Sequence, residues 1–234
     1  TIGFTLEASF WDAAIEKITF TGDSHFEAIG TLMFWGSNIK EIDLNGVIEI
    51  GSSAFEDCLN LESVSSNTCY YIGDYAFYCC KNLKSASFPN CLEIYERAFY
   101  ECESLAEINF EKLEWMDWYV FQYCESLPAT LELENIEYIG SYAFEGCCSL
   151  TSVKIPDSVT AIGNGAFNGC TSLTKIDLPE NITSIGSRAF SGCTSLEEIT
   201  IPEKVTTIYD STFEGCTGLI EIYIPKGVST IEDF

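Results

Sequence analysis

The segment SLTKIDLPENITSIGSRAFSGCTSLEEITIPEKVTTIYDSTFEGCTGL (residues 172–219) carries nearly the same pattern twice, once around Phe190 and once around Phe213. A unit of this length has too few apolar residues to bury its own core, so neighbouring units must cover one another. The repeat therefore predicts a stack of similar coils. Inward positions are held constant by packing, and function must be sought in the outward positions, where copies differ.

The repeat extends over most of the 234 residues. The residue five positions before the repeating phenylalanine is apolar in every copy, and a leucine stands six positions after it from Leu61 onward. Phe10, 24 residues before Phe34, marks a degenerate earlier copy. The phenylalanines recur at intervals of 21 to 23 residues, at Phe34, Phe55, Phe77, Phe99, Phe121, Phe144, Phe167, Phe190 and Phe213.

Each copy also carries a short strand pattern. In residues 173–178, Ile176 and Leu178 alternate with polar residues, and Pro179 ends the run because proline cannot donate to a ladder. A coil of 22–23 residues leaves no room for long helices. We therefore predict a solenoid with one long parallel sheet on one face, its strands about 4.7–4.9 Å apart, and short extended segments and turns on the other.

The later copies are similar in consensus to a known family. The stretch IPDSVTAIGNGAFNGCTSLTKIDLP (residues 155–179) resembles the BspA-like subfamily of leucine-rich repeats almost throughout. The resemblance implies a leucine-rich-repeat solenoid, of the repeat α/β class but mostly β, over residues 26–234, with residues 1–25 as a degenerate N-terminal repeat. It further implies a secreted or surface-attached protein that acts in adhesion and protein binding.

Three features depart from a regular, closed array of copies. Ser37 replaces the cysteine of the first regular copy, and LPATLEL (residues 127–133) contains one extra residue and Pro128. At this insertion we expect a local irregularity such as a β-bulge. The C-terminal TIEDF (residues 230–234) opens a further copy. We therefore expect the solenoid to be cut inside a repeat and the natural protein to be longer.

The charge of the chain bears on its partners. Thirty-six acidic against eleven basic residues give a formal charge of −25, which opposes binding to nucleic acid and to anionic lipid. No apolar run approaches the roughly 18–20 residues of a membrane span, so we expect no direct membrane insertion. The N-terminal TIGFTLEASF (residues 1–10) has no signal-peptide pattern.

Twelve cysteines invite the question of disulfides or metal. Stacked parallel side chains hold their Cβ atoms farther apart than a bridge allows, so the repeating cysteines are predicted to be buried free thiols. Cys79 and Cys148 lie outside that column and are the stronger candidates for reactive or bridging thiols. The column, three residues after the phenylalanine, is Cys58, Cys80, Cys102, Cys124, Cys147, Cys170, Cys193 and Cys216.

Residues that typically form metal or catalytic sites are sparse. With His25 as the only histidine and no C-x-x-C pair, the sequence predicts no metal site, no cofactor and no enzymatic activity. Asn181 begins an acceptor sequon for glycosylation and follows a strand that ends in proline, so it should be exposed.

Two outward surfaces are candidate binding sites. On the sheet face, small and charged side chains form either a ligand surface or a solvated sheet, and interface anchors such as tyrosine are few. Its candidate residues are Glu107, Asn109, Lys154, Lys175, Asp177, Glu198, Glu221 and Tyr223.

On the returning face, aromatic residues crowd copies three to six and then disappear. We call this set the aromatic stripe, and its stacking should place Arg97 between Tyr75 and Tyr119. The rings either cover a thin part of the core or form a surface for a partner or for self-association. The aromatic stripe is Tyr71, Tyr75, Arg97, Trp115, Tyr119, Tyr138 and Tyr142.

The sequence supports two functional hypotheses. The first is a non-catalytic module of a larger secreted or surface protein, which binds a protein partner or a host surface ligand. The second is a structural repeat protein that spaces or assembles a larger complex by lateral stacking. An extracellular or cell-surface location follows from the resemblance, whereas unpaired buried cysteines would also suit the cytoplasm.

Overall fold

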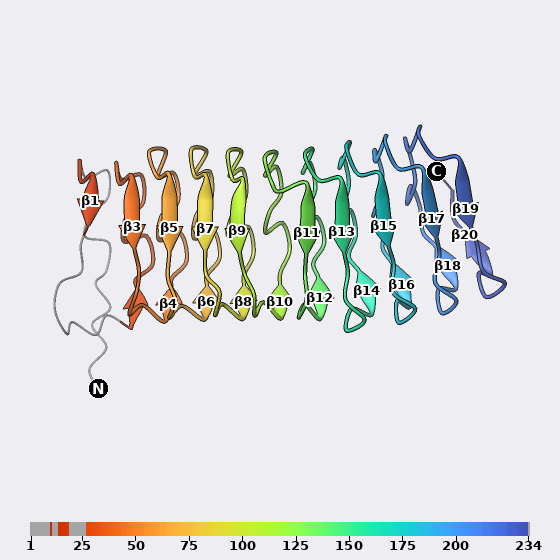
Figure 1. The fold of residues 1–234 in the computed structure, drawn as a ribbon, viewed down its shortest axis with the longest axis horizontal. Helices are drawn as coiled ribbons and strands as arrows, with labels where there is room; N and C mark the ends of the chain where they lie inside the picture. The colour runs from red at the N-terminus through yellow and green to blue at the C-terminus, as the bar shows by residue number, and fades with distance from the viewer. Residues whose placement is uncertain (1–9, 11–13, 19–26, 234) are drawn as a thin grey trace.

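The computed structural model describes Phe10, residues 14–18 and residues 27–233. Figure 1 shows an elongated stack of flattened coils, with one row of strands along each long side. The described residues contain strands and turns but no helix. The prediction of a mostly-β parallel solenoid is therefore confirmed. His25 and most of the predicted N-terminal repeat, residues 1–25, lie outside the described residues, and that boundary stays a prediction.

Each coil contributes one strand to each of two faces. The sheet face carries β1 (Lys17–Ile18), β3 (Glu41–Asp43), β5 (Ser63–Ser65), β7 (Ser85–Ser87), β9 (Glu107–Asn109), β11 (Thr130–Glu132), β13 (Ser152–Lys154), β15 (Lys175–Asp177), β17 (Glu198–Thr200) and β19 (Glu221–Tyr223). The returning face carries β2 (Ala28–Ile29), β4 (Glu49–Ile50), β6 (Tyr71–Ile72), β8 (Glu93–Ile94), β10 (Trp115–Met116), β12 (Tyr138–Ile139), β14 (Ala161–Ile162), β16 (Ser184–Ile185), β18 (Thr207–Ile208) and β20 (Thr230–Ile231).

The register of both faces follows the sequence repeat. On the returning face Ile72 pairs with Ile94, and on the sheet face Val153 pairs with Ile176. All four side chains are buried. Because equivalent residues pair wherever neighbouring strands are joined, each repeating position becomes a column along the solenoid, and outward residues of neighbouring copies meet.

The repeating phenylalanines form a continuous spine through the core. From Phe10 to Phe213, successive rings lie 5.0–5.8 Å apart between centroids and are within 18° of parallel. The stacking of Phe10 on Phe34 continues this spine into the N-terminal region. Stacked rings stabilise one another beyond the apolar area that they bury. Because each ring stacks on the rings before and after it, the spine links each coil to its two neighbours.

The cysteine column forms a second ladder beside the spine. Each of its thiols donates to the carbonyl oxygen of the phenylalanine in the preceding coil, at 3.0–3.2 Å. In the first regular copy, the Ser37 hydroxyl lies 3.4 Å from the Cys58 sulfur. All twelve cysteines are free, as predicted for the column. The repeated cysteine therefore supplies both apolar volume and a hydrogen bond between coils.

The sheet face is interrupted, whereas the returning face is continuous over eight strands from β2 to β16. The sheet face consists of three parallel segments, β1 to β9, β11 to β15, and β17 with β19. The first interruption falls at the extra residue of 127–133. We expected a bulge there, but β9 and β11 do not pair at all, and Figure 1 shows a wider interval between them than between β7 and β9.

Candidate functional site

Four residues of the aromatic stripe occupy one turn position, two residues before the spine phenylalanine. This position has a left-handed backbone, which costs an L-residue roughly 1–2 kcal/mol relative to a right-handed one. Ser53, Gly165 and Ser211 adopt the same conformation in other coils. The coil therefore imposes the strain whether or not a ring is present. The four residues are Tyr75 (φ 57°), Arg97 (φ 55°), Tyr119 (φ 63°) and Tyr142 (φ 59°).

Arg97 lies between two tyrosine rings, as its column predicts. Its Cζ is 5.7 Å from the centroid of the Tyr75 ring and 4.2 Å from that of Tyr119. Arg97 Nη1 also donates to Tyr75 Oη at 2.9 Å and pairs with Glu96. Tyr119 in turn stacks on Tyr142, with centroids 5.1 Å apart and rings 2° from parallel. A cation–π and stacking ladder thus crosses four coils.

This ladder ends at Gly165. A Cβ at Gly165 would lie 2.4 Å from Cδ1 of Tyr142, so the tyrosine ring rests directly on the glycine backbone. In the next two coils the same position holds Arg188 and Ser211. The tyrosine ladder is therefore confined to the middle of the solenoid.

The other three residues of the aromatic stripe lie on returning strands. Trp115 of β10 stacks on Tyr138 of β12, with centroids 4.7 Å apart and rings 20° from parallel. Tyr71 of β6 is in the same row but is separated from Trp115 by Glu93 of β8. Tyr71 contacts Tyr70 instead, at 6.5 Å between centroids. The structure therefore brings Trp115 and Tyr138 together but leaves Tyr71 at the end of the row.

Sequence reasoning missed several aromatic residues of the same region. Trp118, which is 49% exposed, donates from Nε1 to Tyr138 Oη at 3.4 Å and so connects to the Trp115 row. Tyr78 stacks on Tyr100 at 4.8 Å, and Tyr75 contacts Tyr78 at 5.5 Å. The same contrast between early and late copies was available for these rings, because later copies carry polar residues at the Tyr78 position.

The spine is buried to the same extent in coils with and without the outer rings. Phe99 and Phe144, which lie beneath the aromatic coils, are 0% exposed. Phe167 and Phe190, in coils without these rings, are also 0% exposed. The later coils therefore bury the spine without outer rings, so the repeat itself does not require the aromatic residues of copies three to six.

A shallow hollow adjoins the aromatic coils on the returning face. It has a volume of about 330 Å³ and is bounded by Tyr138 at one end and Tyr209 at the other. Its lining between them is small, and includes Ala161, Gly163 and Ser184. The hollow lies where later copies replace the rings of β10 and β12 with small side chains.

The predicted residues of the sheet face project into solvent. Seven of the eight are exposed, and Asn109 is half-buried. Lys175 pairs with Asp177 at 3.2 Å within β15, and the register places Glu198 beside Glu221. A hydrogen bond to Glu221 raises the pKa of Tyr223. The structure gathers no cluster of interface anchors here, so these side chains form a mainly solvated, acidic surface.

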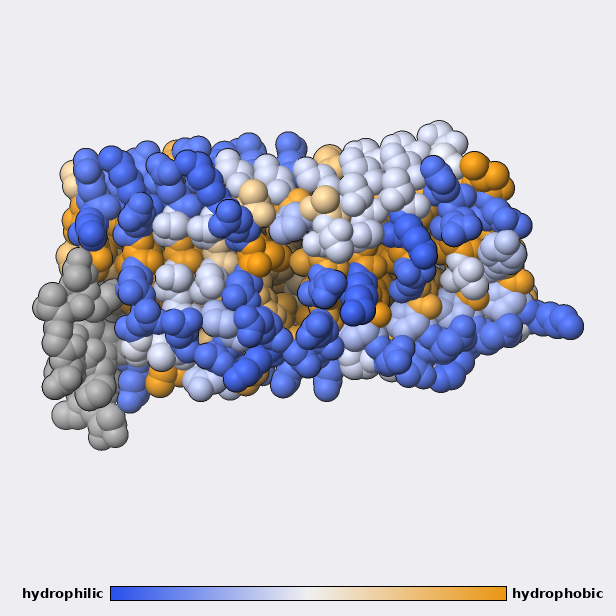
Figure 2. All heavy atoms as spheres, viewed as in Figure 1, coloured by the Kyte–Doolittle hydropathy of each residue, from blue (hydrophilic) through white to orange (hydrophobic). Residues whose placement is uncertain are grey.

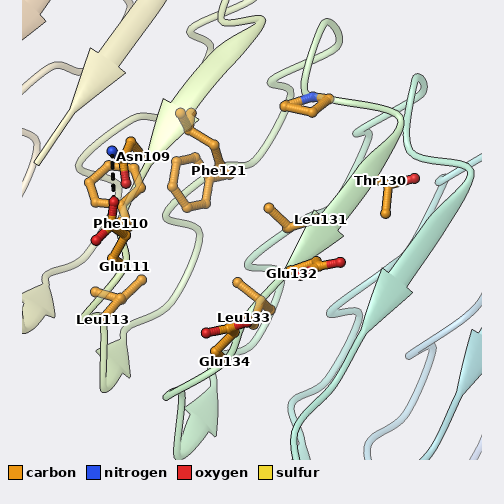
Figure 3. A pocket seen from close by; sticks show the side chains of 12 residues that line it. Asn109, Phe110, Glu111, Leu113, Phe121, Thr130, Leu131, Glu132, Leu133 and Glu134 are labelled. Carbon is orange, nitrogen blue, oxygen red and sulfur yellow. Dashed lines mark hydrogen bonds between the residues drawn. The ribbon is translucent and has the colours of Figure 1, made fainter. Parts of the chain in front are cut away.

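A pocket opens where the sheet face is interrupted. It lies between β9 and β11 and has a volume of about 470 Å³. Figure 3 shows Phe110 and Phe121 on one side of it and Leu131 and Leu133 on the other, and Asn109 hydrogen-bonds to Glu111 at the rim. The space-filling view in Figure 2 shows apolar residues reaching the surface along the middle of the molecule. The extra residue of 127–133 indicates an irregularity here but not a pocket.

Of the four cysteines outside the column, Cys69 and Cys91 are free and buried, and Cys79 and Cys148 are free and half-buried. Burial raises the pKa of Cys79 to about 12, and the neighbouring Glu101 carboxylate, 3.6 Å away, adds to the effect. A raised pKa leaves little thiolate at neutral pH, which disfavours reaction at Cys79, and its reactivity stays a prediction. The Cys148 sulfur lies 3.8 Å from the carbonyl oxygen of Gly169. Neither residue is in a disulfide.

Asn181 is exposed, as predicted from the sequon. Its side chain donates to the carbonyl oxygen of Asp157 at 3.0 Å and accepts from Lys204 at 2.9 Å. Glycosylation at this site stays a prediction.

The described part of the chain contains neither a metal cluster nor a membrane-spanning helix. Within Phe10, residues 14–18 and residues 27–233, no three His, Cys, Asp or Glu side chains are grouped so that they could hold a metal ion. In the same residues, no helix has the length and apolar character of a membrane span.

These features define the class of protein: a leucine-rich-repeat solenoid with short parallel strands on both faces. The family model described as BspA type leucine rich repeat region matches residues 6–128 and 137–234, in six copies. The chain belongs to this family. The interval between the two matches, residues 129–136, contains β11 and part of the pocket lining.

Solved structures agree on the fold. A leucine-rich repeat protein from Bacteroides ovatus is 29% identical, with a TM-score of 0.66 over 88% of this chain, and a T. pallidum leucine rich repeat protein is 25% identical, with a TM-score of 0.50 over 83%. The chain spans 60% of the B. ovatus protein and 79% of the T. pallidum protein. A leucine rich cell surface protein from Faecalibacterium prausnitzii, 23% identical, has a TM-score of 0.44, with 92% of this chain and 85% of that one covered. Among curated proteins, none matches the chain.

Proposed function

We propose that this chain is a non-catalytic protein-binding module and that its aromatic stripe is the principal binding surface. The single observation that carries the proposal is the equal burial of the spine in both groups of coils, because coils of the same repeat bury it without these rings. Exposed aromatic area with a fixed geometry is typical of binding hot spots. Trp115 is 41% exposed and Trp118 is 49% exposed, so this surface has anchors available to a partner.

The stacking geometry supports binding for a second reason. The ladder holds Tyr119 and Tyr142 parallel, and Arg97 is held by Tyr75 and Glu96. Side chains that are already ordered lose little conformational entropy when a partner binds. The aromatic stripe is therefore a preorganised surface and not a set of independent mobile rings.

We further propose that the module belongs to a larger secreted or cell-surface protein, as the family resemblance implies. Free cysteines are compatible with an oxidising environment when they are inaccessible. Burial raises the pKa of the Cys58 thiol to about 11, and the thiols of the column donate to carbonyl oxygens inside the core. Oxidation requires an accessible thiolate, so these cysteines are protected while the coils stay folded.

The test compares the wild type with the triple variant Tyr75→Ser/Tyr119→Ser/Tyr142→Ser. Serine suits this turn, because Ser53 and Ser211 already occupy it with φ values of 55° and 52°. Each immobilised protein is incubated with a detergent extract of surface proteins from the host tissue, and bound proteins are identified by mass spectrometry. We expect partners captured by the wild type to be lost from the folded triple variant.

The control is Tyr209→Ser/Tyr223→Ser, which removes two exposed tyrosines outside the aromatic stripe. This double variant should capture the same partners as the wild type. Equal capture by the wild type and the triple variant would show that the aromatic stripe is not the binding surface.

The second candidate function, lateral self-assembly, is favoured by the hollow beside the aromatic coils. In a two-fold arrangement, the rings of one copy could enter the hollow of another and receive that copy's rings in return. Ala161→Tyr tests this arrangement, because Trp115 and Tyr138 show that this strand position accepts a ring. Self-assembly predicts oligomers that dissociate on dilution and disappear in Ala161→Tyr, as measured by sedimentation velocity. A monomer at all concentrations contradicts it.

A further inference from the structure

The interruption between β9 and β11 has the form of a sheet that lacks one strand. On the sheet face, Leu44 N donates to Ser65 O, Ser66 N to Ser87 O and Phe88 N to Asn109 O, at 2.8–3.0 Å. Within residues 27–233 this series does not continue from Phe110 to β11. The first segment of the sheet therefore ends with an open edge at β9, and the second begins with an open edge at β11.

The gap between β9 and β11 is wider than the spacing of directly paired strands. Neighbouring strands are about 4.7–4.9 Å apart, so a strand inserted between two edges requires them to be about 9.4–9.8 Å apart. The Cα atoms of β9 and β11 are more than 8 Å apart, whereas β7 and β9 are directly paired. On the opposite face β8, β10 and β12 remain paired, so the coils stay stacked while the gap is open.

The gap exposes core side chains that are covered elsewhere. Phe88 is 0% exposed, but Phe110, at the same position of the next coil, is only partly buried. Phe110 stacks on Phe88 at 5.9 Å and reaches the pocket, where Leu133 of the following coil is also partly buried. The pocket therefore offers apolar contacts to an inward-pointing side chain of an added strand.

The rim of the gap carries negative charge. Glu107 projects outward from β9 and Glu132 from β11, and Glu111 and Glu134 line the pocket. The whole chain has a formal charge of −25, so its electrostatic field disfavours an acidic ligand. A strand that fits between these edges should carry basic residues at the positions whose side chains face outward to the rim. At the alternate positions, whose side chains face inward to the pocket, it should carry apolar residues.

We propose that the gap between β9 and β11, which we call the strand slot, binds an extended segment of a partner protein by β-augmentation, and that the segment alternates basic and apolar residues. The segment pairs with both open edges, so its main chain supplies the missing ladder. Its apolar side chains enter the pocket beside Phe110 and Leu131, and its basic side chains pair with Glu107 and Glu132. This site is separate from the aromatic stripe and shares with the proposed function only that the chain binds protein.

The repeat itself supports this assignment. The family model matches the chain on both sides of residues 129–136 but not within them. That interval contains β11, Leu133 and Glu134, so the coil that opens the slot is also the one that departs from the repeat. The departure changes the sheet face alone, since β12 on the returning face keeps its register with β10.

The probe for the test is the peptide acetyl-Lys-Val-Lys-Val-Lys-amide with a fluorescent label, followed by fluorescence anisotropy at physiological salt. We expect saturable binding to the wild type. The same peptide methylated at the valine nitrogens cannot donate to a strand edge and should bind at least about tenfold more weakly, because main-chain hydrogen bonds carry affinity in β-augmentation. Equal binding by the methylated peptide, or no binding of the parent peptide, overturns the proposal.

Two charge-reversal variants separate the strand slot from general attraction to an acidic protein. Glu107→Lys/Glu132→Lys changes the rim, and Glu198→Lys/Glu221→Lys makes the same change in charge at exposed positions of β17 and β19. We expect at least about a tenfold loss of affinity for the rim variant and little change for its control. Equal losses in the two variants contradict a specific site.

Two further measurements, of peptide binding by another variant and of the oligomeric state, complete the test. The triple variant of the aromatic stripe should bind the peptide as the wild type does, so a failed partner capture and a failed strand slot remain distinguishable. If the wild type instead forms dimers that Glu107→Lys/Glu132→Lys dissociates and the peptide does not bind, the occupant is a second copy of this chain and the peptide proposal is overturned.

Discussion

Coils three to six and coils seven to nine share a core but differ in their surfaces. In both groups the spine phenylalanines stack in parallel, and the cysteine thiols donate to the preceding coil. In the first group the turn before the spine carries Tyr75, Arg97, Tyr119 and Tyr142, and in the second it carries Gly165, Arg188 and Ser211. The comparison shows that the repeat specifies the coil and leaves the outer layer free to be selected for binding.

The largest effect should be the same in both groups. Phe99→Ala and Phe167→Ala each remove a fully buried ring from the spine, which typically costs about 3–5 kcal/mol. Urea unfolding followed by circular dichroism measures both variants. If the outer rings did support the core, Phe99→Ala would cost clearly less than Phe167→Ala, because neighbouring rings could share the load.

Coupling between coils predicts a second effect of the same substitutions, on hydrogen exchange. Each ring stacks on the coils before and after it, so the damage should spread to neighbours. Hydrogen exchange in Phe167→Ala should therefore accelerate in the coils of Phe144 and Phe190. Acceleration confined to one coil would contradict a continuous spine.

The next effect depends on pH. Burial raises the pKa of Cys58 from its ordinary value near 9 to about 11, so the folded protein holds this proton to higher pH than the unfolded chain does. The free energy of unfolding should therefore be unaffected below about pH 9 and fall as the pH rises from 9 to 11, by about 1.4 kcal/mol per pH unit for this thiol. The Cys216 pKa is also raised to about 11, but this thiol is partly open to water and should contribute less.

Urea unfolding between pH 8 and pH 11 checks this for the wild type and for Cys58→Ala and Cys216→Ala. Each variant lacks one titrating thiol, so its loss of stability with pH should be shallower than that of the wild type, and more so for Cys58→Ala. Identical slopes in all three proteins would mean that these thiols are not buried in the neutral form.

The smallest effect concerns the end of the tyrosine ladder. Gly165→Ala and Gly169→Ala both place a side chain on a left-handed backbone, with φ values of 57° and 70°, and this conformation alone should cost each variant about 1 kcal/mol. A Cβ at Gly169 meets no atom closer than 3.7 Å, whereas one at Gly165 meets the Tyr142 ring. Near-ultraviolet circular dichroism should therefore change in Gly165→Ala alone. A changed tyrosine signal in both variants would contradict the stacking assignment.

The sequence was a good guide wherever a position repeats. The spine, the buried cysteine column and the neighbours of Arg97 follow from the period, because parallel stacking places equal positions side by side. The interruption of the sheet near Pro128 could not be predicted from the period, since an extra residue can produce either a bulge within a sheet or a gap between two strands. The missing pairing between β9 and β11 shows that the extra residue is accommodated as a gap.

Contacts between different columns were also beyond the sequence pattern. The hydrogen bond from Trp118 to Tyr138 joins two columns whose separation across the turn depends on the coil's exact path. The raised pKa of Cys79 depends on burial and on Glu101 of the next coil, which occupies the same column as Cys79 and so was in principle accessible. The prediction that Cys79 is reactive considers this residue without Glu101 and therefore does not include the effect of that carboxylate on the thiol.

The central claim is that the outer rings of coils three to six serve binding and not folding. Urea unfolding of Tyr75→Ser/Tyr119→Ser/Tyr142→Ser, measured beside its partner capture, tests it most directly. We predict one cooperative transition whose midpoint falls only by the loss of the outer stacking contacts, together with lost capture by the folded variant. A clearly lowered midpoint, with partner capture intact in the fraction that remains folded, would contradict the claim.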